Sequence, residues 1–305
     1  MAANMAESLE ALVVASFGRH LQVRDANGQR HDARPFGRKL SLVCGDRVRC
    51  ERSAQNQELH VVAALPRRNA LQRSNARGGA EAVVANISLL VIVLAPRPQP
   101  DPFMVDRYLA AAASANIEAL LLVNKIDLGV IAELGRELAI WQKLGYAVQS
   151  CAARLRQGID ELAARLHGHT AVVVGQSGVG KSSLLKQLVP LATIATGELV
   201  RDEAGRHTTT TSQLYELPSG GELIDSPGVR DFAPAISALE PRSLGFVEVD
   251  RAGVSCKFQD CRHMQEPHCA VRAALTAGNI AARRYESYRR LRRLFEELTA
   301  AQRPG

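Results

Sequence analysis

The chain has 305 residues, a formal net charge of +7, 46% hydrophobic residues and 23% charged residues. This length predicts two or three domains, and the ordinary globular composition excludes an intrinsically disordered chain. No apolar stretch follows a charged start, so a secretory signal is not expected, and the most hydrophobic run, residues 82–95, is too short to span a bilayer. We therefore expect a cytoplasmic protein with no membrane partner.

The charge is concentrated at the two ends of the chain. Residues 1–77 carry 13 Lys and Arg against 7 Asp and Glu, and residues 251–305 carry 11 against 5, so each end has a net charge of +6. Residues 78–250 carry 14 against 19, a net −5. Basic flanks are typical of proteins that bind a polyanion, most often nucleic acid, although an ordinary solvated surface is the alternative.

The segment from Phe17 to Leu71 carries β signals. Turn dipeptides such as Asn27-Gly28 separate short alternating runs at residues 21–23, 40–43, 47–50 and 59–62. This pattern predicts a small OB-type β-barrel within residues 1–74. Because the segment has few aromatic side chains, backbone and shape contacts with RNA are favoured over base stacking; a purely structural barrel is the alternative.

Residues 72–80 are polar and are expected to form a linker. Beyond them, apolar strands at 87–94 and 120–123 flank a predicted helix at 103–115. Strands that alternate with helices indicate a parallel α/β sheet, which we assign to residues 75–236.

The sequence Asn124-Lys125-Ile126-Asp127 follows the second of these strands directly. The Asp127 carboxylate can accept hydrogen bonds from guanine N1–H and N2–H₂, which adenine does not offer together. The Asn124 amide can reach the base or brace the phosphate-binding loop, and the Lys125 stem can cover the ring. In the later loop at 150–153, small residues let a backbone N–H approach guanine O6. Ala152 and Ala153 are the favoured donors, and a plain loop is the alternative.

Residues 175–183 fit the motif G-x-x-x-x-G-K-[ST], between a β-branched strand at 171–174 and a helix at 183–188. Glycines let the backbone N–H groups point inward at a helix N-terminus and hold phosphate oxygens. Lys181 reaches the β- and γ-phosphates, and the Ser182 hydroxyl can bind magnesium. The expected nucleotide-binding residues here are Gly175, Gln176, Ser177, Gly178, Val179, Gly180, Lys181, Ser182 and Ser183.

The polar segment at 193–213 contains Thr208–Thr211 and is expected to be a switch that responds to the γ-phosphate, with one threonine as a magnesium ligand. A predicted hairpin at 212–224 then ends in Asp225-Ser226-Pro227-Gly228. In this D-x-x-G motif, Asp225 is expected to bind magnesium, through water, and the Gly228 N–H to reach the γ-phosphate.

Near the C-terminus, three thiols and one imidazole lie within 14 residues: Cys256, Cys261, His263 and Cys269. This donor set suits tetrahedral structural zinc; His268 is a competing ligand, and free cysteines are the alternative. The final stretch reads as a helix with an apolar stripe of Tyr288, Leu291, Phe295 and Leu298. Its remaining faces are basic and favour rRNA phosphates over a plain solvated surface. The basic residues are Arg283, Arg284, Arg289, Arg290, Arg292 and Arg293, and some of them are expected to lie beside the stripe.

These motifs are those of a GTPase, but N-K-x-D precedes the phosphate loop. The chain resembles the circularly permuted GTPases of small ribosomal subunit biogenesis (RsgA) along nearly its whole length. The resemblance implies a multi-domain fold: an N-terminal OB-type barrel, a central α/β permuted P-loop GTPase domain and a helical zinc-binding domain at 237–305. It also implies a monomer that hydrolyses GTP to GDP, with magnesium, when it binds the small ribosomal subunit and its rRNA late in maturation.

The same resemblance assigns the magnesium-binding threonine to Thr209 and supports His263 as the zinc ligand. Val229 follows D-x-x-G and cannot hydrogen-bond to water, so we expect slow intrinsic hydrolysis. His207 is the local candidate for positioning the water, and a surface histidine is the alternative. Two other functions are alternatives: a scaffold that binds GTP without hydrolysis, and a GTPase with a protein or membrane target.

Overall fold

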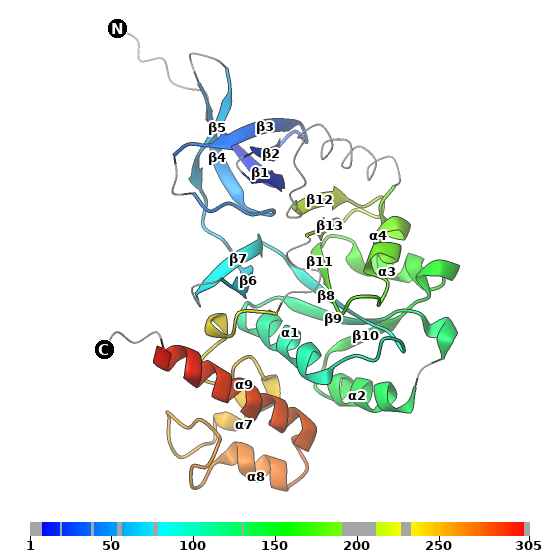
Figure 1. Cartoon of the computed structure of the whole chain (residues 1–305), viewed down its shortest axis with the longest axis vertical. Coiled ribbons are helices and arrows are strands. Elements are labelled where there is room, and N and C mark those ends of the chain that lie inside the picture. The colour runs from blue at the N-terminus through cyan, green and yellow to red at the C-terminus, as the bar shows by residue number, and fades with distance from the viewer. Residues whose placement is uncertain are drawn as a thin grey trace.

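The computed structural model describes residues 8–18, 20–37, 40–53, 57–75, 79–129, 131–190, 212–226 and 233–301. Three parts follow one another along the long axis of the molecule (Figure 1): a β-barrel, an α/β unit in the middle and a helical module at the far end. No helix within the described ranges is long and apolar enough to cross a membrane.

Five strands form the N-terminal barrel: β1 (Ser8–Phe17), β2 (His20–Asp25), β3 (Arg30–Pro35), β4 (Arg47–Arg52) and β5 (Leu59–Ala64). Strands β3 and β5 are parallel, the other pairs are antiparallel, and pairing of β1 with β4 closes the barrel. Successive side chains of a strand alternate between its two faces, so valines from four strands fill the interior. The predicted barrel is confirmed.

The strand expected at residues 40–43 is wrong. The N–H of Val43 donates to the Asp46 carboxylate at 2.8 Å, and Arg67 donates to the carbonyl of Ser41 at 2.9 Å. Side chains therefore occupy backbone groups that a strand would pair. Strands β1 and β3 exist although no local pattern predicts them. In β1 the second half is a nearly continuous buried run, and in β3 Ala33 is the one buried residue, so neither shows clear alternation.

The linker expected at residues 72–80 is wrong as well. Strands β6 (Ala70–Ser74) and β7 (Ala80–Ala85) pair antiparallel as a separate sheet, and Arg73 donates to Glu81 across them at 2.6 Å. Leu71 and Val84 are buried in the core of the α/β unit. A polar turn has the same composition as a linker, and only the pairing of its flanks distinguishes the two.

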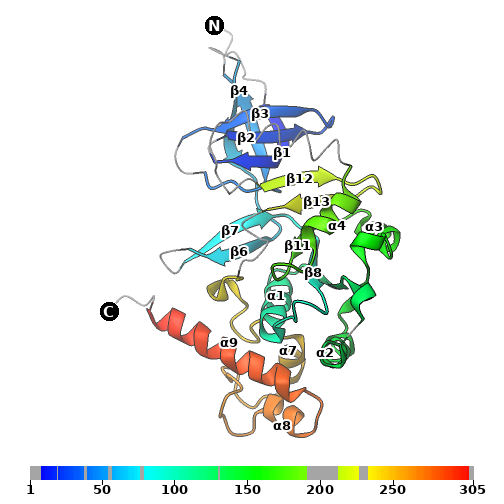
Figure 2. The ribbon, with the colours of Figure 1, turned by 45° about the vertical axis from the view of Figure 1, so that its right-hand side comes forward.

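The central sheet has six strands, and β12 alone runs antiparallel to its neighbour within this sheet. Their order is β10 (Ala147–Ser150), β9 (Glu118–Val123), β8 (Leu89–Leu94), β11 (Thr170–Val174), β13 (Glu222–Asp225) and β12 (Ser212–Glu216). The predicted strands at 87–94, 120–123 and 171–174 and the hairpin at 212–224 are confirmed. Pairing of β12 with β1 continues the ladder into the barrel (Figure 2).

Helices cover both faces of this sheet. One face packs against α1 (Pro102–Ser114) and α2 (Ala132–Lys143), and the other against α3 (Ile159–Leu166) and α4 (Lys181–Leu188). Strand β8 lies between the two layers, and all six of its residues are buried. Because parallel strands end at the same edge, the segments after β8, β9, β11 and β13 meet there, which is where nucleotides bind in such folds.

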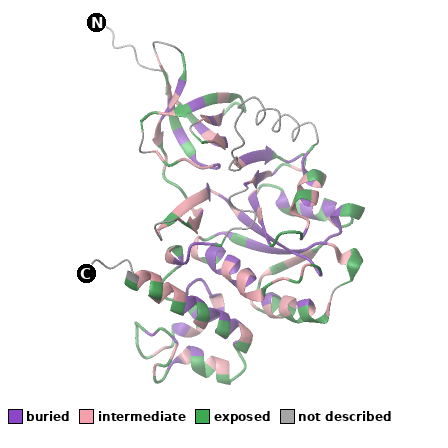
Figure 3. Ribbon diagram, in the orientation of Figure 1, coloured by how far each residue is buried: buried purple, intermediate pink, exposed green. Residues whose placement is uncertain are grey.

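The C-terminal module contains the turn η3 (Ile236–Ala238) and the helices α7 (Val247–Gly253), α8 (Ala270–Thr276) and α9 (Ala282–Ala301). Helix α9 buries one side and exposes the other (Figure 3). The predicted apolar stripe is confirmed, because Tyr288 and Leu291 are fully buried and Phe295 and Leu298 pack against the same cluster.

The six arginines of α9 do not form one basic face. Arg284 and Arg292 are buried, Arg283 is half-buried, and all three bind groups within the protein. The exposed guanidinium of Arg290 lies 4.0 Å from the ring centre of Phe103, at the start of α1. As expected, some of these arginines lie beside the apolar stripe, and the buried ones are not available to RNA.

Candidate nucleotide site and metal centre

The phosphate loop connects β11 to α4 and depends on glycine at two close approaches. Gly175 has φ +141°, and a Cβ there would lie 2.4 Å from the carbonyl oxygen of Val93. Gly180 has φ +102°, and its Cβ would lie 2.3 Å from the side-chain nitrogen of Asn124. Any larger residue would have to displace the neighbouring strand or the motif that follows it. The loop is thus held tightly against β8 and residue 124.

Lys181, the first residue of α4, folds back over this loop. Its Nζ atom donates to the carbonyls of Gly175 at 2.5 Å and Gln176 at 2.9 Å. The ammonium group therefore lies inside the loop, within reach of the position where phosphate oxygens would accept the same hydrogen bonds.

The buried side chain of Asn124 connects three segments of the site. Its Nδ2 donates to the carbonyl of Val179 in the phosphate loop at 2.9 Å, and its Oδ1 accepts from the N–H of Ala153 at 3.0 Å and from the Cys151 thiol at 3.5 Å. Burial raises the pKa of this thiol to about 11, so it stays a neutral donor. Of the two roles expected for Asn124, the geometry favours the brace over a base contact.

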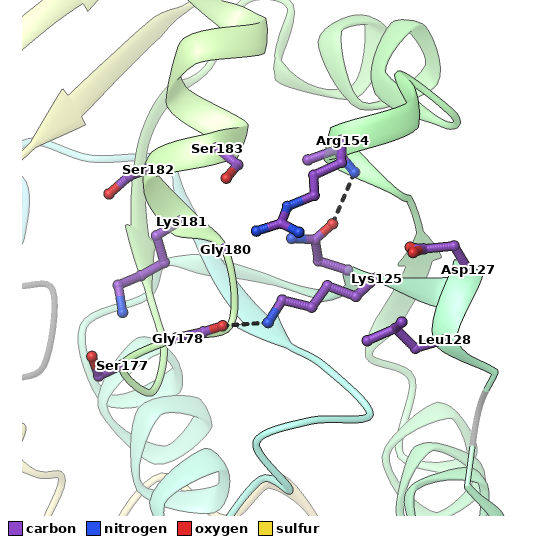
Figure 4. A pocket seen from close by; sticks show the side chains of 12 residues that line it. Lys125, Asp127, Leu128, Arg154, Ser177, Gly178, Gly180, Lys181, Ser182 and Ser183 are labelled. Atoms are coloured by element: carbon purple, nitrogen blue, oxygen red, sulfur yellow. Dashed lines mark hydrogen bonds between the residues drawn. The ribbon is translucent and has the colours of Figure 1, made fainter.

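Lys125 has a left-handed backbone conformation, with φ 60°, which turns its side chain toward the phosphate loop. Its Nζ donates to the carbonyls of Gly178 at 2.5 Å and Arg97 at 3.1 Å (Figure 4). The stem of Lys125 thereby forms one wall of a cleft, as a residue that covers a base must.

This cleft has a volume of about 430 Å³, which is within the range of small-molecule sites. Figure 4 shows side chains from the N-K-x-D segment and the phosphate loop around the same space. The lining residues are Asn124, Lys125, Asp127, Leu128, Ala153, Arg154, Ser177, Gly178, Gly180, Lys181, Ser182 and Ser183. The two motifs, about 50 residues apart in sequence, thus form one site.

In the loop expected to reach guanine O6, the two favoured N–H donors are already occupied. The N–H of Ala152 donates to the carbonyl of Gln157 at 2.9 Å, and that of Ala153 donates to Asn124. Both amides therefore have partners within the protein. Arg154, the next residue, lines the cleft and was not singled out from the sequence, because an arginine in a short loop carries no local signal.

Ser182 and Asp225, two of the expected magnesium ligands, both line one small cavity of about 20 Å³, together with Lys181 and apolar side chains of β11, α4 and β13. A hydroxyl and a carboxylate are the hard oxygen donors that magnesium prefers, so the chemistry of these two side chains suits the ion, although the cavity itself is mostly apolar. Thr209, His207, Gly228 and Val229 lie outside the described residues.

Cys256, Cys261, His263 and Cys269 form a second site, in the C-terminal module. Their donor atoms all lie within 4.8 Å of one another. The Nδ1 atom of His263 is 3.5 Å from the sulfur atoms of both Cys256 and Cys269, and these two sulfurs are 4.0 Å apart. Tetrahedral zinc with ordinary bond lengths needs separations of about 3.6–3.8 Å, so the cluster fits. The described cluster does not include His268, which is exposed.

Helix α9 holds the loop that carries these donors. The Tyr285 hydroxyl donates to the carbonyl of His263 at 2.6 Å, and that of Tyr288 donates to the carbonyl of Arg262 at 2.8 Å. Burial raises the pKa of the Cys261 thiol to about 12 and lowers the pKa of His263, to which Arg292 also contributes. The imidazole is thus a neutral donor at neutral pH, and a bound cation would favour the thiolate.

These features define a class of protein: a P-loop nucleotide-binding protein in which the guanine motif comes before the phosphate loop in the chain. Comparison with known proteins agrees, since the family model of the RsgA GTPase matches residues 64–234. The chain belongs to the RsgA GTPase family and is a GTP-hydrolysing enzyme.

The similarity extends over nearly the whole chain. The "small ribosomal subunit biogenesis GTPase RsgA" of Chromohalobacter salexigens is 43% identical over 290 residues, which cover 92% of this chain and 84% of that protein. The protein of the same name from Azotobacter vinelandii is 43% identical over 288 residues, with the same coverage.

Two solved structures are also similar. The crystal structure of YjeQ from Thermotoga maritima has a TM-score of 0.72 and 28% identity, and covers 98% of this chain and 100% of that chain. YloQ, described as a circularly permuted GTPase, has a TM-score of 0.70 over 100% of both chains; at 21% identity it supports the fold alone.

Proposed function

We propose that this GTPase binds the small ribosomal subunit through its rRNA and assists a late step of its maturation. The observation that carries the proposal is the 43% identity, over 92% of the chain, to relatives named for small ribosomal subunit biogenesis. Two exposed basic areas support an RNA partner, because phosphate contacts dominate nucleic-acid affinity. They are Arg47 and Arg49 on the barrel, and Arg290 and Arg293 on α9.

Guanine would be recognised at the end of the cleft beside β9. Asp127 accepts from the base N1–H and N2–H₂, and the stem of Lys125 covers one face of the ring. Since the N–H groups of Ala152 and Ala153 already have partners, we propose the backbone N–H of Arg154 as the donor to guanine O6. Recognition thus depends on N-K-x-D and on a loop 30 residues later.

The phosphates would occupy the loop at 175–183, where Lys181 exchanges its present carbonyl partners for β- and γ-phosphate oxygens. Magnesium, when bound with GTP, neutralises charge on these phosphates; Ser182, Thr209 and Asp225 are its proposed protein ligands. Catalysis then rests on fixed donors directed at the transferring phosphoryl group.

Positioning of the attacking water is the weak point of the intrinsic reaction. Val229 replaces a hydrogen-bonding residue after D-x-x-G, so we propose slow hydrolysis by the free protein. His207, or a group of the bound subunit, orients the water instead.

We also propose the division into domains at 1–74, 75–236 and 237–305, a monomeric state and a cytoplasmic location. The boundary after Ser74 falls inside the hairpin of β6 and β7, so limited proteolysis of the full chain checks it. A stable fragment that begins near residue 65 would move the boundary to the other side of the hairpin.

The experiment that tests the function is GTP turnover with and without purified small ribosomal subunits. Large subunits serve as the control and ATP as the competitor. We expect strong stimulation by small subunits alone, unaffected by ATP and reduced by added salt. Turnover that stays flat with every subunit would refute the ribosome-stimulated mechanism.

A further inference from the structure

Strand β1 belongs to two hydrophobic cores. Val13 packs inside the barrel, whereas the next residue, Val14, is fully buried in the core of the α/β unit. Successive side chains of a strand point to opposite faces, so Ala11 and Val13 enter the barrel core while Leu12 and Val14 pack against the core of the α/β unit. One strand is thus fixed by both parts of the molecule. A bulge follows directly, where the pairing of β1 with β2 shifts register between Val13 and Ala15.

Beyond the bulge, β1 pairs with the edge of the GTPase sheet. Ala15 is paired with Gln213 and Ser16 with Ser212, the first residues of β12 (Figure 2). An edge strand otherwise presents unpaired backbone groups. Here the barrel covers that edge where β12 begins, directly after the segment in which the switch threonine is expected.

The same position contacts the D-x-x-G motif. The Ser212 hydroxyl donates to the Oγ of Ser226 at 2.7 Å, and Gln213 is paired with Asp225. Ser226 is buried, so its hydroxyl has little access to water as a substitute partner. This hydrogen bond fixes the direction of the chain as it leaves β13, next to the proposed magnesium ligand Asp225.

A cluster of ion pairs connects the barrel to the β12–β13 hairpin of the GTPase domain. Arg24 on β2 donates to Glu216 at 2.5 Å and to Glu222, which lie at the two sides of the turn between β12 and β13. Glu222 also accepts from the Thr170 hydroxyl at 2.7 Å, at the start of β11. The side chains of Arg24 and Glu222 are 17% and 23% exposed, so solvent screens this pair less than an ordinary surface pair, whereas Glu216 is 58% exposed and contributes less.

We propose that the barrel is a built-in partner of the GTPase domain on the β12 edge, and that Ser212 and Arg24 are positioning residues for GTP hydrolysis. Ser212 acts on Asp225 through Ser226, and Arg24 holds the hairpin from which both switch segments extend. Because coupling between two sites is reciprocal, the nucleotide state must also change the stability of β1 in the barrel.

The first test compares Ser212→Ala with Ser212→Thr, which keeps the hydroxyl. In single-turnover hydrolysis without ribosomal subunits, we expect Ser212→Ala to lower the rate about tenfold, the effect of one lost hydrogen bond, while nucleotide affinity stays within about twofold. Ser212→Thr should restore the rate. A rate unchanged in Ser212→Ala, or lowered equally in both variants, would overturn the positioning role. Nucleotide binding, measured on the same samples, separates this failure from a failure of the proposed function.

The second test measures amide hydrogen exchange of residues 8–17 in the full-length protein, with GDP and with a non-hydrolysable GTP analogue. We expect the protection of β1 to differ by about fivefold or more between the two states, the lower end of typical coupling. Arg24→Gln should reduce the difference below about twofold, and Arg52→Gln, an exposed position on the same barrel, should retain it. Equal exchange in both states of the wild-type protein would overturn the coupling.

Discussion

The buried arginine that joins the C-terminal module to the GTPase domain offers the sharpest test of the fold. Arg284 on α9 is 1% exposed and donates to both carboxylate oxygens of Glu248, at 2.7 and 2.9 Å, and to Asp106 of α1 at 2.7 Å. Asp106 also accepts from the indole N–H of Trp141 at 2.8 Å and from Arg283. The perturbation is Arg284→Met, which removes the charge and keeps a long apolar side chain.

Removal of Arg284 affects the hydrogen bonding of Asp106 and Glu248 to different degrees. Asp106 keeps Arg283 and Trp141 as partners, whereas Glu248, 7% exposed, has no other described side-chain partner. An uncompensated buried charge costs about 3–5 kcal/mol, whereas neutralising both members of a pair is often close to neutral. We therefore expect Arg284→Met to destabilise the junction by about 3–5 kcal/mol. Adding Glu248→Gln should recover more than half of that loss.

Trp141 is the sole tryptophan and lies fully buried at this junction, so its fluorescence reports on the junction directly. Urea unfolding followed by this fluorescence should show a lower midpoint for Arg284→Met. The expected shift is about 1–2 M, if the free energy of unfolding falls with urea concentration at the usual rate. Arg289→Met is the matched control, because Arg289 on the same helix forms only a partly exposed pair with Glu286 and should change stability by less than about 1 kcal/mol.

Two results would refute this reasoning. One is a decrease in the free energy of unfolding of less than about 1 kcal/mol in Arg284→Met, which would mean that water or a rearranged side chain compensates the charge of Glu248. The other is a double variant no more stable than the single one, since the cost would then come from lost packing of Arg284 on Phe246 and not from charge.

Three further predictions concern the sites. Cys261→Ala should reduce zinc content, measured by atomic emission, from about one per chain to near zero, whereas His268→Ala should keep it; equal loss in both would mean a different ligand set. Asp127→Asn should weaken GTP binding by a factor of about 10²–10⁴, the effect of one or two charged hydrogen bonds, and favour xanthosine triphosphate, whose 2-oxo group accepts from an amide; unchanged preference in competition binding would contradict the guanine pocket. Gly180→Ala should abolish nucleotide binding, since its Cβ would lie 2.3 Å from a side-chain nitrogen of N-K-x-D. Gly135→Ala, in open space within α2, should instead stabilise the fold by about 0.5–1 kcal/mol in thermal unfolding.

Most of the α/β unit could be predicted from sequence because its signals are local. A fully buried strand such as β8 is a continuous apolar run, and the phosphate loop needs its glycines and lysine at fixed spacing. The zinc donors were identifiable for the same reason, since four ligands within 14 residues limit how the loop can fold. The switch threonines at 208–211 and the end of the D-x-x-G motif, from residue 227 on, lie outside the described residues, so their predicted roles stay predictions.

The errors arose where structure depends on distant partners. Strand β1 has no clear alternation because both of its faces are buried, each in a different core. Residues 40–43 carry a strand-like pattern, but Asp46 and Arg67 hold their backbone groups and prevent strand pairing. In α9, the sequence shows six similar arginines, but only contacts with Asp106, Glu248 and backbone carbonyls distinguish the buried from the exposed ones.

The sequence by itself predicts the chemistry of this protein: which motifs are expected to bind phosphate, guanine and zinc, and that their order is permuted. Those properties reside in residue types at short spacing, which the chain carries in any conformation. Only the tertiary structure decided which amides of the loop after β10 already have partners and that β1 covers the β12 edge. It also decided that Arg284 forms buried ion pairs within the protein and does not contact RNA. Each of these depends on groups that are far apart in sequence, so packing alone brings them together.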